Sequence, residues 1–259
     1  NILPNEDDDI SNIVKNSFVK RGIVLKTNSS LKSVNINKDT VTSEIIHNGN
    51  SEIINSEKVI LAVGIIANTQ NLGLENFNIK IDKGHIVTNE YLETGEKGIY
   101  AIGDVTGGPW LAHKASHEGI LCVEKMAGVS NLSPIDKSSI PGCTYCRPQV
   151  ASIGLTEKAA KSKSLNIKVG KFPFIGNGKA IALGDSEGII KTIFNKDTGE
   201  LIGAHMVGPE VTELIQGFSI AKKLETTEHE LMHTIFPHPT LSEGIHESVL
   251  DAFNKAIHY

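Results

Sequence analysis

A histidine and a glutamate near the C-terminus have the residue types and spacing of an acid–base pair. His238 and Glu243 lie five positions apart in the sequence HPTLSE. A carboxylate that bonds one imidazole nitrogen fixes the ring tautomer and makes the other nitrogen a better base near neutral pH. The bond to Pro239 also permits a cis peptide, which costs ~1 kcal/mol before proline and ~3 kcal/mol elsewhere. The same spacing suits a surface loop ahead of a helix, so both interpretations stay open.

A second pattern has the spacing of a metal site. His229 and His233 flank Glu230 in H-E-x-x-H, the zinc metalloprotease motif in which two histidines bind metal and the glutamate acts as general base. Thr227 and Glu230 also match a capping box, which would occupy the glutamate at a helix start. Pro237 should end that helix after about two turns. We predict no metal site and keep a zinc metalloprotease as the alternative function.

The three cysteines allow a redox or zinc interpretation that we do not favour. Cys143 and Cys146 have C-x2-C spacing, but there is no second pair to complete a zinc site. Cys122 occupies an apolar position in a helical pattern and suits a core. Three cysteines in 259 residues argue against a disulfide-stapled secreted protein and for a reducing compartment.

Composition predicts a globular protein with one large or two smaller domains. Hydrophobic residues make up 39% of the chain, charged residues 21%, and the net charge is −5. No run of about 18 apolar residues is present, so we predict no membrane span. The mild acidity gives no electrostatic case for nucleic acid as a partner.

Hydrophobic periodicity predicts two kinds of secondary structure in succession. The first part should contain a helix over 6–21 and then an antiparallel meander, a buried strand over 59–63, a hairpin at 82–84, a strand over 99–102 and a helix over 112–127. The meander strands are expected at 23–25, 31–36, 41–46 and 52–54. The later part should place helices at 157–163 and 211–224 among strands at 150–155, 167–172, 188–194 and 201–207.

Four segments resemble motifs of one family, in that family's order. They are Val59–Gly64 followed by Asn68-Thr69, Gly98–Val105, Leu111–Ala115 followed by His117-Glu118-Gly119, and HPTLSE. Together they resemble the flavin disulfide reductases, and among these the dihydrolipoamide dehydrogenases. The resemblance implies a mixed α/β and α+β fold. Residues 1–72 would form part of a nicotinamide domain, residues 73–137 a central FAD-contacting segment, and residues 138–259 an interface (dimerisation) domain. That last domain is expected to hold a mainly antiparallel sheet with helices on one face.

The resemblance also implies roles for individual residues. His238 would be the catalytic base, and Glu243 would orient it. The cofactor-binding residues would be Gly103 and Asp104 at the flavin ribityl chain, Leu111, Ala112 and His113 at the flavin ring through their backbone, Pro239, and Gly64 at the nicotinamide dinucleotide. From the residues alone, a helix-capping role is the alternative for Asp104. Ile65 and Ile66 stand where the family often has basic residues, which is a departure near the adenosine side of that cofactor.

The activity that the resemblance implies is the reoxidation of dihydrolipoamide in 2-oxoacid dehydrogenase or glycine cleavage complexes. Electrons would pass through a redox disulfide and FAD to NAD. The resemblance further implies a homodimer in which His238 serves the partner subunit, lipoyl domains as partners, and a cytoplasmic location, or the mitochondrial matrix in a eukaryote. A glutathione-reductase-like enzyme is the nearest alternative, which Leu241 argues against. A non-catalytic dimerisation module is a third interpretation.

Three motifs of the family are missing from the sequence. There is no G-x-G-x-x-G for the flavin pyrophosphate, no C-x4-C redox pair, and no second G-x-G-x-x-G for the nicotinamide cofactor. The first residues resemble a point midway through the nicotinamide domain. We therefore expect the C-terminal portion of a longer enzyme, and we expect this chain alone to be inactive and to lack FAD.

Overall fold

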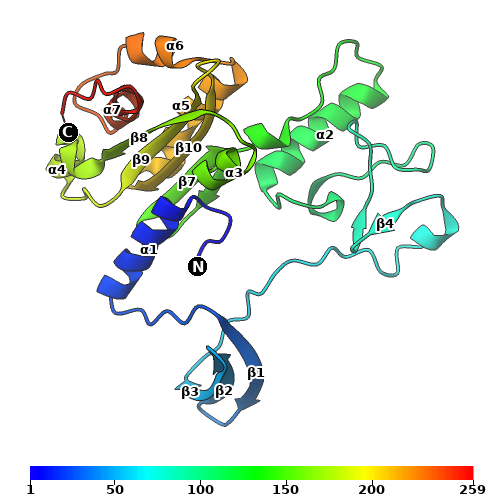
Figure 1. Cartoon of the computed structure of the whole chain (residues 1–259). Coiled ribbons are helices and arrows are strands. Elements are labelled where there is room, and N and C mark those ends of the chain that lie inside the picture. Colours follow the sequence, from blue (N-terminus) through cyan, green and yellow to red (C-terminus); the bar gives the residue numbers. More distant parts are fainter. Residues whose placement is uncertain (259) are drawn as a thin grey trace. The chain divides into compact units, whose positions relative to one another are not determined.

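The computed structural model describes residues 1–258 and divides the chain into two compact units. Unit 1 joins residues 1–60 to the residues from 141 onward, and unit 2 is the intervening segment 61–140. Figure 1 shows the chain with its elements labelled. Unit 1 is therefore discontinuous in sequence. The domain boundaries expected after residues 72 and 137 stay a prediction.

The centre of unit 1 is a five-stranded antiparallel sheet with the order β6-β7-β10-β9-β8. Its strands are β6 (Gly142–Thr144), β7 (Gln149–Gly154), β8 (Ile167–Pro173), β9 (Ile189–Asn195) and β10 (Leu201–Gly208). Strand β10 lies in the middle, and all of its residues are buried. A strand that is covered on both faces reads as a continuous apolar run, as β10 does.

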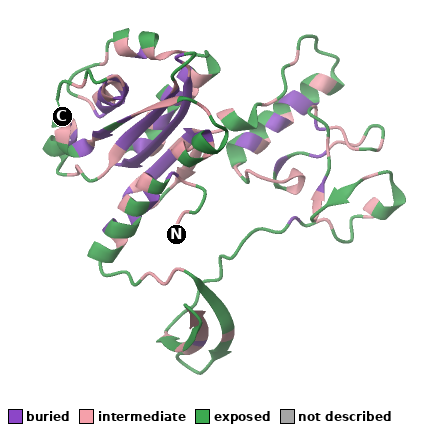
Figure 2. Cartoon of the chain, viewed as in Figure 1, coloured by how far each residue is buried: buried purple, intermediate pink, exposed green. Residues whose placement is uncertain are grey.

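Helices cover both faces of this sheet, and the two longer helices of the C-terminal part share one face. Helices α5 (Val211–Lys223) and α7 (Glu243–Ala252) pack against one side, where Met206, Ile215 and Val249 belong to one core. On the other side Ile10 and Val14 of α1 (Asp8–Lys20) pack with strand residues, and the short α3 (Glu157–Ser162) joins a smaller cluster. Buried residues concentrate in these strands and helices (Figure 2). The mainly antiparallel sheet that we predicted is confirmed, but its helices lie on both faces and not on one face only.

The remaining elements of unit 1 are the strands of a second sheet and some short helices. Three of them form the meander β1 (Ser29–Ile36), β2 (Val41–His47) and β3 (Asn50–Ser56), with order β1-β2-β3. Asn48 and Gly49 connect β2 to β3 with φ of 48° and 83°, the left-handed backbone that a two-residue hairpin turn requires. The strand expected at 23–25 is absent. The other short elements are η4 (Phe174–Gly176), α4 (Gly178–Leu183) and α6 (Glu228–His233).

Unit 2 contains one long helix and little regular sheet. Helix α2 (Ala112–Met126) matches the predicted helix, and β4 (Ile81–Asp82) with β5 (His85–Ile86) forms the predicted hairpin. Three short 3-10 turns complete it, namely η1 (Leu74–Asn76), η2 (Gly103–Thr106) and η3 (Lys137–Ser139).

Two of the strand predictions, one within unit 2 and one at the boundary between the units, are wrong. Residues 59–63 have no strand structure, and Ile60 and Val63 are 90% and 85% exposed. Residues 99–102 contribute only an isolated bridge at Tyr100. An apolar run becomes a buried strand only when neighbouring strands satisfy its backbone. No strand within residues 1–258 pairs with 59–63, so its apolar side chains stay in solvent. No helix among the described residues is long and apolar enough to cross a membrane.

Candidate active site

The HPTLSE segment enters helix α7 through a tightly bonded turn. The His238–Pro239 peptide bond is cis, and Leu241 is buried in the main core with 8% exposure. The Thr240 hydroxyl donates to the Pro237 carbonyl at 2.7 Å, and the buried Asn177 amide donates to the Thr240 carbonyl at 3.0 Å. Leu241 anchors the segment, and these bonds fix the backbone on either side of Pro239.

This turn brings His238 and Glu243 together. His238 Nδ1 lies 2.8 Å from Glu243 Oε1, and the Thr240 N–H donates to Glu243 Oε2 at 2.8 Å. Because a carboxylate can only accept, Nδ1 carries the proton and Nε2 carries the lone pair when the ring is neutral. Within residues 1–258 Nε2 has no hydrogen-bond partner, and the His238 side chain is 78% exposed. The arrangement presents a basic nitrogen to solvent.

Glu243 is held in its ionised form. Burial on its own would raise the pKa of the Glu243 carboxyl, but the Thr240 N–H and the His238 ring lower it below its ordinary value. Glu243 is also the first residue of α7, where the helix dipole favours a negative charge. The carboxylate therefore stays charged near neutral pH and can stabilise an imidazolium on His238.

The H-E-x-x-H segment forms a helix cap in place of a metal site. Thr227 and Glu230 make the predicted capping box, with the Thr227 N–H donating to Glu230 Oε2 at 3.0 Å. His233 Nδ1 lies 2.7 Å from the His229 carbonyl, to which it donates. The residues that the structure describes contain no group of three or more possible ligands arranged for a metal ion. The glutamate that a metalloprotease would need as a base is thus bonded to backbone.

The cysteines lie in surroundings that suppress their reactivity. Burial raises the pKa of the Cys143 thiol, with Glu213 and Glu6 adding to the shift, and burial also raises the pKa of Cys146. A neutral thiol is a poor nucleophile and a poor metal ligand. Cys122 is 5% exposed in α2, as the core interpretation predicted.

The residues expected at the flavin lie in unit 2, around η2 and the start of α2. Gly103 is buried with a φ of 76°, whereas Asp104 is exposed and next to it in the turn. Helix α2 begins at Ala112 without a side-chain cap at Leu111, and its first turn contains no acidic residue. The Leu111 N–H donates to the Pro109 carbonyl at 3.1 Å. Helix starts without a side-chain cap can bind anions or polar ring atoms, and a flavin site at this position stays a prediction.

The structure places the other expected cofactor residues less distinctively. Gly64 has a φ of 142° and lies in the exposed segment that was expected to be a strand. His113 is exposed in the first turn of α2, and Pro239 belongs to the cis bond beside His238. The roles of all these residues stay predictions.

Comparison with known proteins gives the family. A sequence model described as pyridine nucleotide-disulphide oxidoreductase matches residues 1–119, and one described as the dimerisation domain of the same proteins matches residues 140–249. The chain belongs to the pyridine nucleotide-disulphide oxidoreductase family. A dihydrolipoyl dehydrogenase of Rhizobium etli is 53% identical over 257 residues, which are 99% of this chain and 53% of that protein.

Other relatives agree with this family. A dihydrolipoyl dehydrogenase of Zymomonas mobilis is 50% identical over 261 residues, covering 100% of this chain and 56% of that protein. The crystal structure of LpdA from Mycobacterium tuberculosis superposes with a TM-score of 0.89 at 28% identity, covering 96% of this chain and 54% of LpdA. The chain spans about half the length of the curated relatives it matches. These relatives support an oxidoreductase of this family and do not support a metalloprotease.

Two buried ion-pair sites were not found from the sequence. Lys114 and Glu118 form an ion pair at 3.0 Å inside unit 2, and Lys191 contacts three carboxylates inside unit 1. The i, i+4 spacing of the first pair was visible, but the same spacing is common on exposed helix faces. Long-range partners such as Asp7 of Lys191 leave no local pattern.

Proposed function

We propose that this chain supplies the acid–base pair and part of the flavin-contacting surface of a dihydrolipoyl dehydrogenase. The observation that carries the proposal is the His238–Glu243 bond at 2.8 Å, with a His238 side chain that is 78% exposed, in a chain 53% identical to such an enzyme. The overall reaction would transfer two electrons from dihydrolipoamide to NAD.

The proposed chemistry at His238 is proton removal from a thiol. Nε2 of His238 takes the proton of a dihydrolipoyl thiol, and the thiolate so formed is the nucleophile that attacks a disulfide. The attack forms a new sulfur–sulfur bond and releases one cysteine thiolate. Glu243 pairs with the imidazolium at Nδ1 and keeps the ring in the orientation that exposes Nε2.

FAD and NAD are the proposed cofactors. When bound, the flavin accepts the electron pair from the dithiol and passes it to the nicotinamide. In this chain Asp104 would bind the ribityl chain beside Gly103, and the amides of Leu111, Ala112 and His113 would face the ring at the start of α2. Pro239 and Gly64 complete the proposed contacts, the latter toward NAD.

The proposed assembly is a homodimer that acts on lipoyl domains of 2-oxoacid dehydrogenase or glycine cleavage complexes. The match of residues 140–249 to a dimerisation domain supports the dimer. In it His238 would serve the partner subunit. Three free cysteines among the described residues support a reducing compartment, and a cytoplasmic location is part of the proposal.

A chimeric enzyme tests this function. The chain is joined to the part of the Rhizobium etli relative that precedes the matched region, since the match covers 99% of this chain. Bound flavin is measured first from the absorption spectrum, and dihydrolipoamide-dependent reduction of NAD is measured second. The unmodified relative is the control for both measurements.

We expect a yellow chimera that reduces NAD with dihydrolipoamide. A chimera that binds FAD and forms a dimer but oxidises no dihydrolipoamide would contradict the proposal, because the remaining defect would then lie in the acid–base residues. Glutathione as the preferred reaction partner would favour the glutathione-reductase-like alternative.

A further inference from the structure

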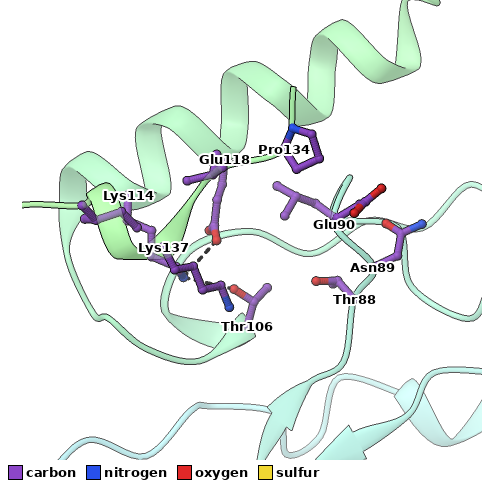
Figure 3. A pocket seen from close by; sticks show the side chains of 11 residues that line it. Thr88, Asn89, Glu90, Thr106, Lys114, Glu118, Pro134 and Lys137 are labelled. Atoms are coloured by element: carbon purple, nitrogen blue, oxygen red, sulfur yellow. Dashed lines mark hydrogen bonds and ion pairs between the residues drawn. The ribbon is translucent and has the colours of Figure 1, made fainter. Parts of the chain in front are cut away.

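A buried ion pair in unit 2 has no role in the chemistry described above. Lys114 and Glu118 lie one turn apart in α2, are 2% and 4% exposed, and place Nζ 3.0 Å from Oε1. They form part of the wall of a cavity of about 280 Å³ (Figure 3). Charged side chains are rarely buried unless every charge is bonded, so the partners of this pair are informative.

Both side chains bond to the backbone of one residue, Gly103. The Gly103 N–H donates to Glu118 Oε2 at 2.7 Å, and Lys114 Nζ donates to the Gly103 carbonyl at 3.2 Å. Lys114 also donates to the Gly107 carbonyl at 2.9 Å and to Thr106 Oγ1 at 3.2 Å. Figure 3 shows the contact between Lys114 and Glu118 as a dashed line. The pair thus holds both ends of the turn that contains Asp104.

This turn begins and ends at a glycine with positive φ. Gly103 has a φ of 76° and Gly107 a φ of 95°, so left-handed glycines bracket residues 104–106. Glycine loses more conformational freedom than other residues when it is fixed. Inside the turn, the Gly107 N–H donates to the Asp104 carbonyl at 3.2 Å, and the Thr106 hydroxyl donates to the Gly103 carbonyl at 2.8 Å. The bonds from Lys114 and Glu118 of α2 add to these two internal bonds.

We propose that Lys114 and Glu118 are positioning residues that hold the η2 turn, and with it Asp104, in place before any ligand binds. A buried ion pair is a poor source of stability, because apolar residues of similar size often replace it at little cost. A buried pair that positions the backbone cannot be replaced in this way, since apolar residues would keep the packing but would no longer bond to the backbone of the turn. The link to flavin rests on the proposed function, whereas the link to the turn does not.

The test uses this chain and compares two double variants. Lys114→Met with Glu118→Met removes both charges and both backbone contacts. Lys114→Met with Glu118→Gln also removes both charges but keeps a carbonyl oxygen that can accept from the Gly103 N–H. Lys125→Met, at a more exposed position of the same helix, is the control. Amide hydrogen exchange of Gly103 and Gly107 is followed by NMR, and thermal unfolding is measured for all proteins.

We expect the two double variants to unfold at similar temperatures, because both are neutral at these positions. The Gly103 amide should exchange about 10 to 100 times faster in the Met double variant than in the native chain, the effect of losing a bond to a charged acceptor. The Gln variant should recover most of that protection, and Lys125→Met should match the native chain. If the Gly103 amide of the folded Met double variant exchanges as slowly as in the native chain, the proposal is overturned.

Two further measurements complete the test. If the Met double variant does not fold, the Gln double variant decides through the Gly107 amide, whose exchange should rise about tenfold once Lys114 no longer holds the turn; unchanged exchange would overturn the proposal. The flavin link is tested in the chimera, which is expected to bind FAD, by comparing the bound FAD of the native residues with that of the Met double variant. Less bound FAD in the Met double variant supports the flavin link. Equal FAD content counts against the flavin link and leaves the exchange result standing.

Discussion

Replacing Lys191 by methionine should destabilise unit 1 strongly. Lys191 lies in β9 with 1% exposure, and its Nζ is 2.7 Å from Asp7 Oδ1 and 2.6 Å from both Asp9 Oδ2 and Glu157 Oε2. The partners come from the N-terminus of α1 and from α3. Methionine is also unbranched and only one atom shorter, so the substitution removes the charge and its three bonds while disturbing the packing little.

The size of the effect follows from burial. Asp7 is 2% exposed, and without Lys191 its carboxylate is left in the interior beside two other acids. Breaking a buried ion pair from one side costs about 3–5 kcal/mol, a large share of the roughly 5–15 kcal/mol that stabilises a domain. Lys171→Met is the matched control, because Lys171 bonds the same Asp9 at 2.9 Å but is 47% exposed. An exposed pair contributes about 1 kcal/mol or less.

The pH dependence has a definite sign. Although burial opposes it, the Lys171 and Lys191 bonds lower the pKa of Asp9, and Lys161 and Lys191 lower that of Glu157. Burial would lower the pKa of Lys191, but its carboxylate partners raise it. Because the pKa values of Asp9 and Glu157 are lower in the folded state, these groups stabilise the fold at pH values above their unfolded pKa values of 3.8 and 4.5. That stability is lost as the pH falls through their folded pKa values. The stability that Lys191 contributes is fully present below pH 10.5, the unfolded pKa of lysine, and is lost as the pH rises through the folded pKa of Lys191.

Urea unfolding followed by circular dichroism measures these differences. The native chain and Lys191→Met should differ most between pH 5 and pH 10, and the difference should narrow as pH falls below about 4, where protonated acids no longer need the cation. A loss below about 1 kcal/mol at pH 7, equal to that of Lys171→Met, would refute the reasoning that burial decides the effect.

Four shorter predictions concern the proposed function. In the chimera, His238→Ala should slow single-turnover reduction by dihydrolipoamide about 100-fold or more, the range for losing a general base, and Glu243→Gln should slow it less; wild-type rates would show that the chemistry lies elsewhere. Light scattering of the chain should give a dimer built mainly from residues 140–249, whereas a monomer would contradict it. The purified chain should be colourless, since its sequence contains no G-x-G-x-x-G to bind the flavin pyrophosphate; a yellow protein would disprove this. Metal analysis after dialysis should find no stoichiometric zinc, and His233→Ala should leave stability unchanged; one tightly held zinc per chain would reverse that view.

The sequence was most informative where chemistry and local structure coincide. His238 and Glu243 are five residues apart, and one turn suffices to bring them into contact. The capping box of Thr227 and Glu230 and the Asn48-Gly49 hairpin likewise depend on neighbours in the chain. Such features could be predicted because the interacting groups are only a few residues apart.

Features that depend on distant partners were predicted wrongly or not at all. Residues 59–63 have the composition of a buried strand, but composition does not reveal whether a paired strand exists. Lys191 lies between Ile190 and Thr192 in the sequence, and only the fold shows the acids of α1 around it. The spacing of Lys114 and Glu118 was visible in the sequence, but it did not reveal that both side chains are buried and bond to the backbone of Gly103.

The discontinuity of unit 1 has a consequence for how the chain is made. Ile10 and Val14 of α1 are fully buried against Val150 and Val207. The first helix can therefore complete its packing only after β10, nearly two hundred residues later, has been synthesised. At about 5–20 residues per second, synthesis of that intervening chain takes roughly 10–40 s. During this time the apolar face of α1 is uncovered on the ribosome, while unit 2 is contiguous and can form first. The apolar face of α1 should therefore be the part of unit 1 that is most accessible to proteases and chaperones during synthesis.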